Sequence, residues 1–128
     1  KWNRKKEESL AQDQVNVLKI RATNLEQEVS NLSGGNQQKV VIAKWLLNNP
    51  RVIIMDEPTR GVDVGSKAEI YEIMNNLAKS GTSIIMISSD LPEIVNMSDR
   101  VAVMREGGIV GILEKEEISQ QKIINLAV

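Results

Sequence analysis

The chain has 128 residues, of which 41% are hydrophobic and 26% charged, an ordinary composition for one globular domain. Its formal net charge of -1 gives no reason to expect nucleic acid or anionic lipid as a partner. The sequence has no cysteine and no histidine, which excludes a disulfide framework, a Ser-His-Asp triad and a histidine metal site. No apolar run approaches the roughly 18 residues of a membrane helix, and no signal peptide is visible. Because the chain starts at Lys1 rather than Met, we expect a piece of a longer protein.

The first part of the chain predicts helices. Residues 1–8 are polar and basic and predict a flexible lead-in, and apolar spacing predicts a helix over 9–20. Residues 21–31 are compatible with a short helix. In NLSGGNQQ, Ser33 is a candidate N-cap for a helix from about residue 35 to 47, which ends before NNP because the residue preceding proline avoids helical geometry.

The second part alternates strands and helices. It opens with a predicted strand at VIIM (52–55) that is buried on both faces, followed by a helix over 65–78 with Ile70, Ile73, Met74 and Leu77 on one stripe. A buried strand at SIIMIS (83–88) and a short helix over 91–95, opened by Asp90 and Pro92, come next. The chain then continues with a strand over 100–105, a Gly107-Gly108 turn, a strand at IVGIL (109–113) and a helix from about Ser119.

This alternation predicts an α/β fold, with a mostly parallel sheet flanked by helices on both faces. The expected internal boundary lies near residues 48–51. It separates a partial helical subdomain over 9–50 from a sheet-bearing core over 51–128.

Two adjacent acids, Asp56 and Glu57, directly follow the predicted strand 52–55. Ligands of open parallel sheets bind beyond the carboxyl ends of the strands. Mg²⁺ takes oxygen ligands and shares them with phosphates and water, and a second carboxylate can deprotonate a water that attacks phosphorus. The pattern therefore favours Mg²⁺ at Asp56 and water activation at Glu57; a strand that ends in a solvated acidic turn is the alternative.

The stretch LSGGNQQKV (32–40) places a serine and two glycines at the start of a predicted helix. Glycines let the backbone approach an anion closely, and a helix N-terminus offers unpaired N–H groups and a positive dipole end. A Ser-Gly-Gly turn alone is also typical of a flexible loop. Its order, before a helix and a strand ending in DEPT, makes the combination specific.

LSGGNQQK followed by VIIMDEPTRGVDVGSK resembles the ATP-binding-cassette (ABC) ATPases. LSGG is similar to their signature motif, and VIIMDE to their Walker B strand with the catalytic glutamate appended. Together with RGVDVG and ISSDLPEI, the sequence is most similar to the second cassette in the ATPase subunits of bacterial monosaccharide importers of the ribose, galactose and xylose type. The resemblance runs from about residue 9 to 128, with the specific motifs in 31–107. It implies the P-loop NTPase fold.

The resemblance also implies roles for individual residues. Ser33, Gly34 and Gly35 would contact the γ-phosphate of an ATP held by the opposing cassette, with Asn36 and Gln37 beside them at the helix start.

Further along the chain, Asp56 would serve Mg²⁺, Glu57 would be the general base, and Asp63 would lie in the loop that crosses to the partner cassette. Ser89 stands where most cassettes have a histidine that reaches the γ-phosphate. Because serine is shorter and cannot become cationic, we expect the site of Asp56 and Glu57 to hydrolyse ATP poorly. A serine that only caps the following turn is a compatible alternative.

No G-x-x-x-x-G-K-[ST] phosphate loop occurs in the sequence; in the family it lies upstream of the signature. We therefore expect the 128-residue chain to bind nucleotide weakly and to be inactive alone. In the parent protein this cassette would mainly lend its signature to ATP on the first cassette. The loss of the phosphate-loop strand would leave a bare sheet edge, which predicts self-association.

The resemblance implies ATP and Mg²⁺ as cofactors, and as partners an opposing cassette, transmembrane permease subunits and, indirectly, a periplasmic sugar-binding protein, but no nucleic acid. It implies a cytoplasmic location on the inner face of the bacterial plasma membrane. It does not identify the sugar.

Three alternatives remain open. The first is a non-catalytic interaction domain with Trp45, Leu46 and Leu47 as surface anchors, although helical spacing more often indicates core. The second is a cassette ATPase of DNA repair or translation, which the NQQK and RGVDVG details and the neutral charge disfavour. The third is a metal-dependent phosphatase, which lacks a further ligand cluster.

Overall fold

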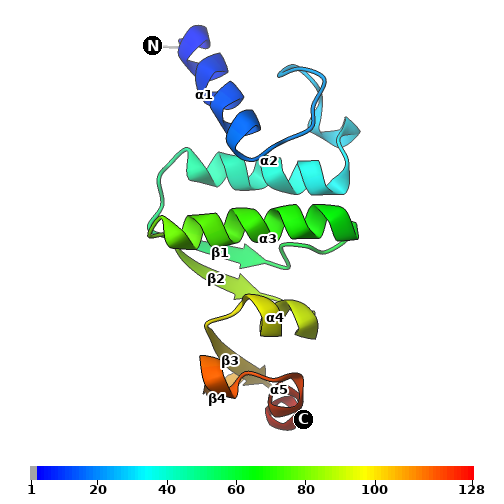
Figure 1. Ribbon diagram of the computed structural model, residues 1–128, viewed down its shortest axis with the longest axis vertical. Coiled ribbons are helices and arrows are strands. Elements are labelled where there is room, and N and C mark those ends of the chain that lie inside the picture. The colour runs from blue at the N-terminus through cyan, green and yellow to red at the C-terminus, as the bar shows by residue number, and fades with distance from the viewer. Residues whose placement is uncertain (1–2) are drawn as a thin grey trace. The chain divides into compact units, whose positions relative to one another are not determined.

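The computed structural model describes residues 3–128, which form two compact units, Lys1–Ile87 and Ser88–Val128 (Figure 1). The first contains α1 (Arg4–Val17), the 3-10 helix η1 (Val29–Asn31), α2 (Gly34–Leu46), β1 (Val52–Asp56), α3 (Val64–Lys79) and β2 (Ser83–Ile87). The second contains α4 (Leu91–Met97), β3 (Arg100–Arg105), β4 (Gly108–Glu114), the 3-10 helix η2 (Lys115–Glu117) and α5 (Gln120–Ala127). Within residues 3–128, every helix is too short or too polar to cross a membrane.

The first helix begins earlier than the sequence predicts. Helix α1 starts at Arg4, so most of the expected lead-in is helical; residues 1 and 2 lie outside the described part of the chain. The Asn3 side chain accepts a backbone N–H of the first turn, and Arg4 pairs with Glu8 one turn later at 2.8 Å. The helix ends at Val17, and Lys19 follows in left-handed geometry with φ 53°.

The predicted strands are all present, but they do not form one mostly parallel sheet. Strands β1 and β2 pair in parallel, with Val52 opposite Ser83 and Asp56 opposite Ile87. Strands β3 and β4 form a separate antiparallel hairpin. The hairpin turn has positive φ at Glu106 (50°) and Gly107 (81°). Such a two-residue turn returns the chain beside the strand it has just left, which is why this pair is antiparallel.

The predictions that β1 is buried on both faces and that β2 is a buried strand are both wrong, since residues of both strands alternate between exposed and more buried positions. Ile53 and Met55 are buried, whereas the alternate residues Val52 and Ile54 are 52% and 66% exposed. A strand hides both faces only when a layer covers each of them. Helices α2 and α3, which lie side by side in Figure 1, contribute to a single core in this unit. The core residues are Leu18, Ile20, Ile42, Ala43, Ile53, Met55, Ile70, Ile73 and Met74.

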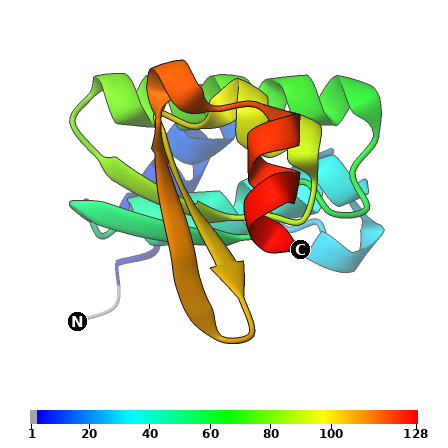
Figure 2. The same ribbon diagram turned by 90° about the horizontal axis from the view of Figure 1, so that it is seen from below.

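The second unit has its own small core, made of Val101, Val103, Leu113 and Ile123. Helix α5 packs on the β3–β4 hairpin, as Figure 2 shows. The predicted helix starts in this unit are confirmed: the Ser119 side chain caps α5, and Asp90 accepts the Glu93 N–H at the start of α4 at 3.1 Å. The division between the units falls after Ile87. The subdomain boundary near residues 48–51 lies inside the first unit and stays a prediction.

Candidate functional site

Helix α2 begins at an accessible Ser-Gly turn. Ser33 is the N-cap, with extended backbone geometry, and its Oγ accepts the Asn36 N–H at 3.3 Å. Ser33 and Gly34 are exposed, whereas Gly35 and Asn36 are buried. The unpaired N–H groups at a helix start attract anions. Of the five predicted nucleotide-binding residues at this turn, Ser33 and Gly34 are therefore the ones that an external anion meets first.

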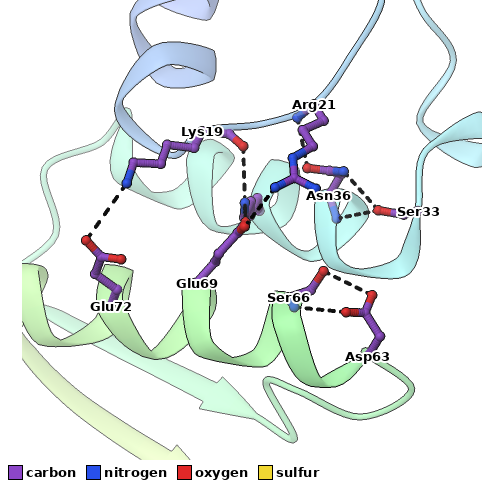
Figure 3. Close-up of polar contacts among 9 residues, drawn as sticks. Lys19, Arg21, Ser33, Asn36, Asp63, Ser66, Glu69 and Glu72 are labelled. Atoms are coloured by element: carbon purple, nitrogen blue, oxygen red, sulfur yellow. Dashed lines mark hydrogen bonds and ion pairs between the residues drawn. The ribbon is translucent and has the colours of Figure 1, made fainter.

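The side-chain amides of Asn36 and Gln37 contact the protein itself. Asn36 Oδ1 accepts the backbone N–H of Arg21 at 2.8 Å, and its Nδ2 donates to Ser33 Oγ at 2.9 Å (Figure 3). Gln37 Nε2 donates to the carbonyl oxygen of Leu32 at 3.0 Å. Both amides thus support the turn, and their predicted contact with nucleotide stays a prediction.

Gly35 allows α2 and α3 to approach closely. A Cβ built at Gly35 would lie 2.4 Å from both Cβ and Oγ of Ser66, a distance that no side chain tolerates. The reason for glycine at this position is therefore helix packing, in addition to the expected approach of an anion.

Asp63 lies at the start of α3 and is the N-cap of that helix. Its carboxylate accepts the Ser66 N–H at 3.0 Å and the Ser66 hydroxyl at 3.1 Å (Figure 3). The Ser66 N–H, followed by the hydroxyl, holds the pKa of Asp63 below its usual value. Asp63 is exposed, and its carboxylate is held at the helix start by these two hydrogen bonds.

Asp56 and Glu57 lie where the sequence predicts, at the carboxyl end of a parallel strand pair. Asp56 is exposed at the last register position of β1, opposite Ile87. The Glu57 N–H donates to the Ile87 carbonyl at 2.7 Å, which continues the ladder by one residue. Glu57 then adopts φ 48°, a left-handed geometry that is rare for residues with a Cβ. The chain thus turns sharply at the second carboxylate.

Asp56 fits a cation that brings most of its own ligands. Within residues 3–128, no three acidic side chains gather into a metal-binding group. Mg²⁺ commonly needs only one or two protein carboxylates, because water and substrate phosphates complete its shell. The exposed Asp56 is suited to such an ion rather than to a closed protein cage.

Ser89 belongs to the second unit, in the turn before α4, and is exposed. Its neighbour Ser88 accepts the Asp90 N–H through Oγ at 3.0 Å, and the capping role considered for Ser89 stays a prediction. Ser88 also donates to the buried carboxylate of Glu93. The predicted role of Ser89 at the γ-phosphate stays a prediction.

A buried ion pair behind the turn at Ser33 was not predicted from the sequence. Lys39 is only 1% exposed, and its ammonium donates to the Lys19 carbonyl at 3.1 Å and to the Glu69 carboxylate. Arg21 also contacts Glu69, at 3.1 Å. The hydrogen bond from Lys39 holds the pKa of Glu69 below its usual value. One signal existed: Lys39 precedes Ile42 by three residues, so it lies on the apolar stripe.

Trp45 and Leu47 are not core residues, contrary to the more frequent outcome at helical spacing. Trp45 is 61% exposed and Leu47 is 47% exposed. Trp45 lines an open pocket between α2 and β1 that extends to Asp56.

Comparison with known proteins agrees with these features. The ABC transporter family model matches residues 3–60. The chain is 57% identical over 121 residues to the ribose import ATP-binding protein RbsA of Bacillus cereus, covering 94% of this chain and 24% of that protein. It is 52% identical over 130 residues to the xylose import ATP-binding protein XylG of Geobacillus kaustophilus, covering 99% of this chain and 26% of that protein. The chain thus spans about a quarter of the length of these relatives.

Solved structures share the fold. An ATP-binding cassette of an ABC transporter, MJ1267, superimposes with a TM-score of 0.80 at 29% identity, covering 98% of this chain and 51% of the other. The dimeric bacterial ABC transporter cassette MJ0796 gives a TM-score of 0.77 at 22% identity, covering 90% and 50%. The 128-residue chain is therefore part of an ATP-binding cassette of the ABC transporter family.

Proposed function

We propose that this segment couples ATP binding and hydrolysis to the import of a monosaccharide. Its particular task is to present Ser33 and Gly34 to an ATP molecule held by an opposing cassette. The observation that carries the proposal is the exposed Ser-Gly tip of α2, held in place from behind by Asn36. The names of the relatives, which are ribose and xylose import ATP-binding proteins, support the substrate class.

In this proposal the strand-end carboxylates form a second, weaker site. Asp56 contributes to holding Mg²⁺, which neutralises phosphate charge when bound. Glu57 accepts a proton from the attacking water, because it is a carboxylate fixed in a sharp turn next to Asp56. Ser89 replaces a potential cation at the γ-phosphate with a neutral hydroxyl, so turnover at this site is slow. Alone, without a phosphate loop in its sequence, the 128-residue chain binds nucleotide weakly and has no measurable turnover.

The proposed partners follow from the same role. They are an opposing cassette and the transmembrane subunits of an importer, which receives sugar from a binding protein. The segment then works at the inner face of the plasma membrane.

Two substitutions in the complete subunit test the proposed division of labour. Ser33→Arg places a long cation where the opposing phosphate should approach, and should abolish transport-coupled ATP hydrolysis. Glu57→Gln removes the base of the weaker site, and should reduce hydrolysis less. Equal damage from both substitutions would instead indicate two working sites, and an active Ser33→Arg variant would overturn the proposal.

The exposed Trp45 supports a second candidate, a non-catalytic interaction domain that binds a partner through α2. The two candidates differ in one observable. A cassette that lends its signature to ATP brings the two cassettes together only when nucleotide is present, whereas an interaction domain associates with its partner equally well without ATP.

A further inference from the structure

We infer that Asn36 is a positioning residue that fixes the Ser33 hydroxyl as a hydrogen-bond donor toward the phosphate of a bound nucleotide. The inference rests on the proposed function, in which Ser33 meets ATP, and adds the reason why this serine donates. It assigns Asn36 a role through Ser33 rather than a contact of its own with nucleotide.

The Asn36 amide has only one orientation that satisfies its neighbours. The backbone N–H of Arg21 lies 2.8 Å from Asn36 Oδ1. A backbone N–H can only donate, so the amide atom that faces it must be the oxygen. The amide nitrogen therefore faces the other way, toward Ser33 Oγ at 2.9 Å (Figure 3).

This orientation determines the hydrogen bonding of the Ser33 hydroxyl. A hydroxyl oxygen accepts two hydrogen bonds and donates one. Ser33 Oγ accepts from the Asn36 backbone N–H at 3.3 Å and from Asn36 Nδ2 at 2.9 Å, so both acceptor positions are occupied. Across residues 3–128 no acceptor takes the Ser33 proton in return. What the exposed Ser33 offers to a ligand is thus a proton, which suits phosphate oxygens because they only accept.

Neighbouring contacts support Asn36 from behind. Lys39 lies three residues further along α2, on the same face of the helix. Its ammonium binds the Lys19 carbonyl at 3.1 Å, while Asn36 binds the Arg21 N–H. Residues 19–21 are therefore attached to α2 at two points, and Glu69 of α3 accepts from both Lys39 and Arg21. This double attachment keeps the Arg21 N–H in place as the group that orients the amide.

Two substitutions at Asn36 separate orientation from simple structural support. Asn36→Asp keeps the oxygen that accepts the Arg21 N–H, but its second oxygen accepts the Ser33 proton and turns it inward. Asn36→Ala loses the Arg21 bond, yet leaves the Ser33 hydroxyl free to rotate outward. With Mg-ATP and the complete ATP-binding subunit, Asn36→Asp should lower kcat/KM about 10- to 100-fold, the scale of one hydrogen bond to a charged group.

The two Asn36 variants should rank in opposite orders for activity and for stability. Asn36→Asp should match Ser33→Ala in kcat/KM and in how far the loss comes from a lower kcat or from a higher KM. Asn36→Ala should lose less activity than Asn36→Asp but have the lower thermal midpoint of unfolding. Asn24→Asp makes the same change at an exposed turn residue, whose Oδ1 accepts the Glu26 N–H at 2.9 Å; it is the control and should leave turnover unchanged.

Each outcome decides one claim. If Asn36→Asp is as active as Asn36→Ala or more so, while Ser33→Ala is impaired, the inference fails and the proposed function stands. If Ser33→Ala retains full turnover, the proposed contact of Ser33 fails and the inference fails with it. Should Asn36→Asp not fold, a double-mutant cycle with alanine replaces it: Asn36→Ala should have no further effect on turnover in the Ser33→Ala background, and an additive effect contradicts the inference.

Discussion

Gly35 and Ser66 bring the start of the signature helix into direct contact with the start of α3. Gly35→Ala would push a methyl group to within 2.4 Å of Ser66. We expect a loss of about 1–3 kcal/mol in the free energy of unfolding, typical of overpacking. Urea unfolding measures it.

The contact itself supplies the control. Adding Ser66→Gly to Gly35→Ala removes the opposing Cβ and should recover part of the lost stability, whereas adding Ser66→Ala keeps that Cβ and should not. Equal stability of the two double variants would show that the clash is not the cause.

The Lys39–Glu69 pair should contribute more to stability than the exposed ion pairs around it. Glu69→Gln leaves an almost completely buried ammonium with a neutral partner, so we expect a loss of about 1–3 kcal/mol in the free energy of unfolding. Glu72→Gln is the matched control, because Lys19 and Glu72 are 3.9 Å apart and largely exposed. It should cost less than about 1 kcal/mol.

The same pair gives stability a dependence on pH. The native pKa of Glu69 lies below its ordinary value, so the unfolded chain binds the proton first as the pH falls. The contribution of Glu69 is complete above the ordinary pKa of a glutamate and disappears as the pH falls through the lowered native pKa. Glu69→Gln should therefore flatten the acid side of the stability profile, and an unchanged profile would contradict this assignment.

At the scale of elements, the starts of α2, α3, α4 and α5 were readable because their causes are local, whereas the start of α1 at Arg4 was missed. Ser33, Asp63, Asp90 and Ser119 each cap a helix with a side chain three residues before the N–H that it accepts, and three residues are visible in any sequence. The exposed faces of β1 and β2 were not readable in this way. They depend on which layers cover the strands, and a run such as VIIM looks the same whether one or two layers are present.

The residues of the candidate site also differ in whether a local sequence pattern could predict them. Ser33, Asp56 and Glu57 were predictable because motif and strand end are adjacent in sequence. The Lys39–Glu69 contact, and the Arg21 N–H that orients Asn36, join residues from separate elements, and no local pattern reveals such partners.

The turn after β1 should carry a measurable backbone cost. Glu57 has φ 48°, which glycine adopts freely and alanine does not. Glu57→Gly and Glu57→Ala remove the same side-chain contacts, so their difference in the free energy of unfolding reports the backbone alone. We expect the glycine variant to be more stable by about 1 kcal/mol, as measured by urea unfolding. An alanine variant of equal or greater stability would show that the turn is unstrained.

At the scale of the whole molecule, the 128-residue chain should self-associate. Within the described residues, β1 and β2 have only each other as neighbours, so the outer edge of each is unpaired. The apolar residues Ile54, Ile85 and Ile87 on these strands are half-exposed or more. Unpaired edges and apolar faces favour a second copy of the chain as partner.

Light scattering over a concentration range measures this association. Ile54→Lys should weaken it, whereas Ile109→Lys, at a similarly exposed position of β4, should have a smaller effect. A strictly monomeric chain at all concentrations would contradict the prediction.

The central claim is that the Ser33 turn faces a nucleotide across an interface between cassettes, and cysteine labelling tests it most directly. This segment contains no native cysteine, so Ser33→Cys introduces one thiol at the turn, and Ser80→Cys places a control at the exposed end of α3. In the complete subunit, a non-hydrolysable ATP analogue with Mg²⁺ should slow maleimide labelling of the Ser33→Cys variant and leave the Ser80→Cys variant unchanged. A labelling rate at position 33 that is the same with and without nucleotide would contradict the account.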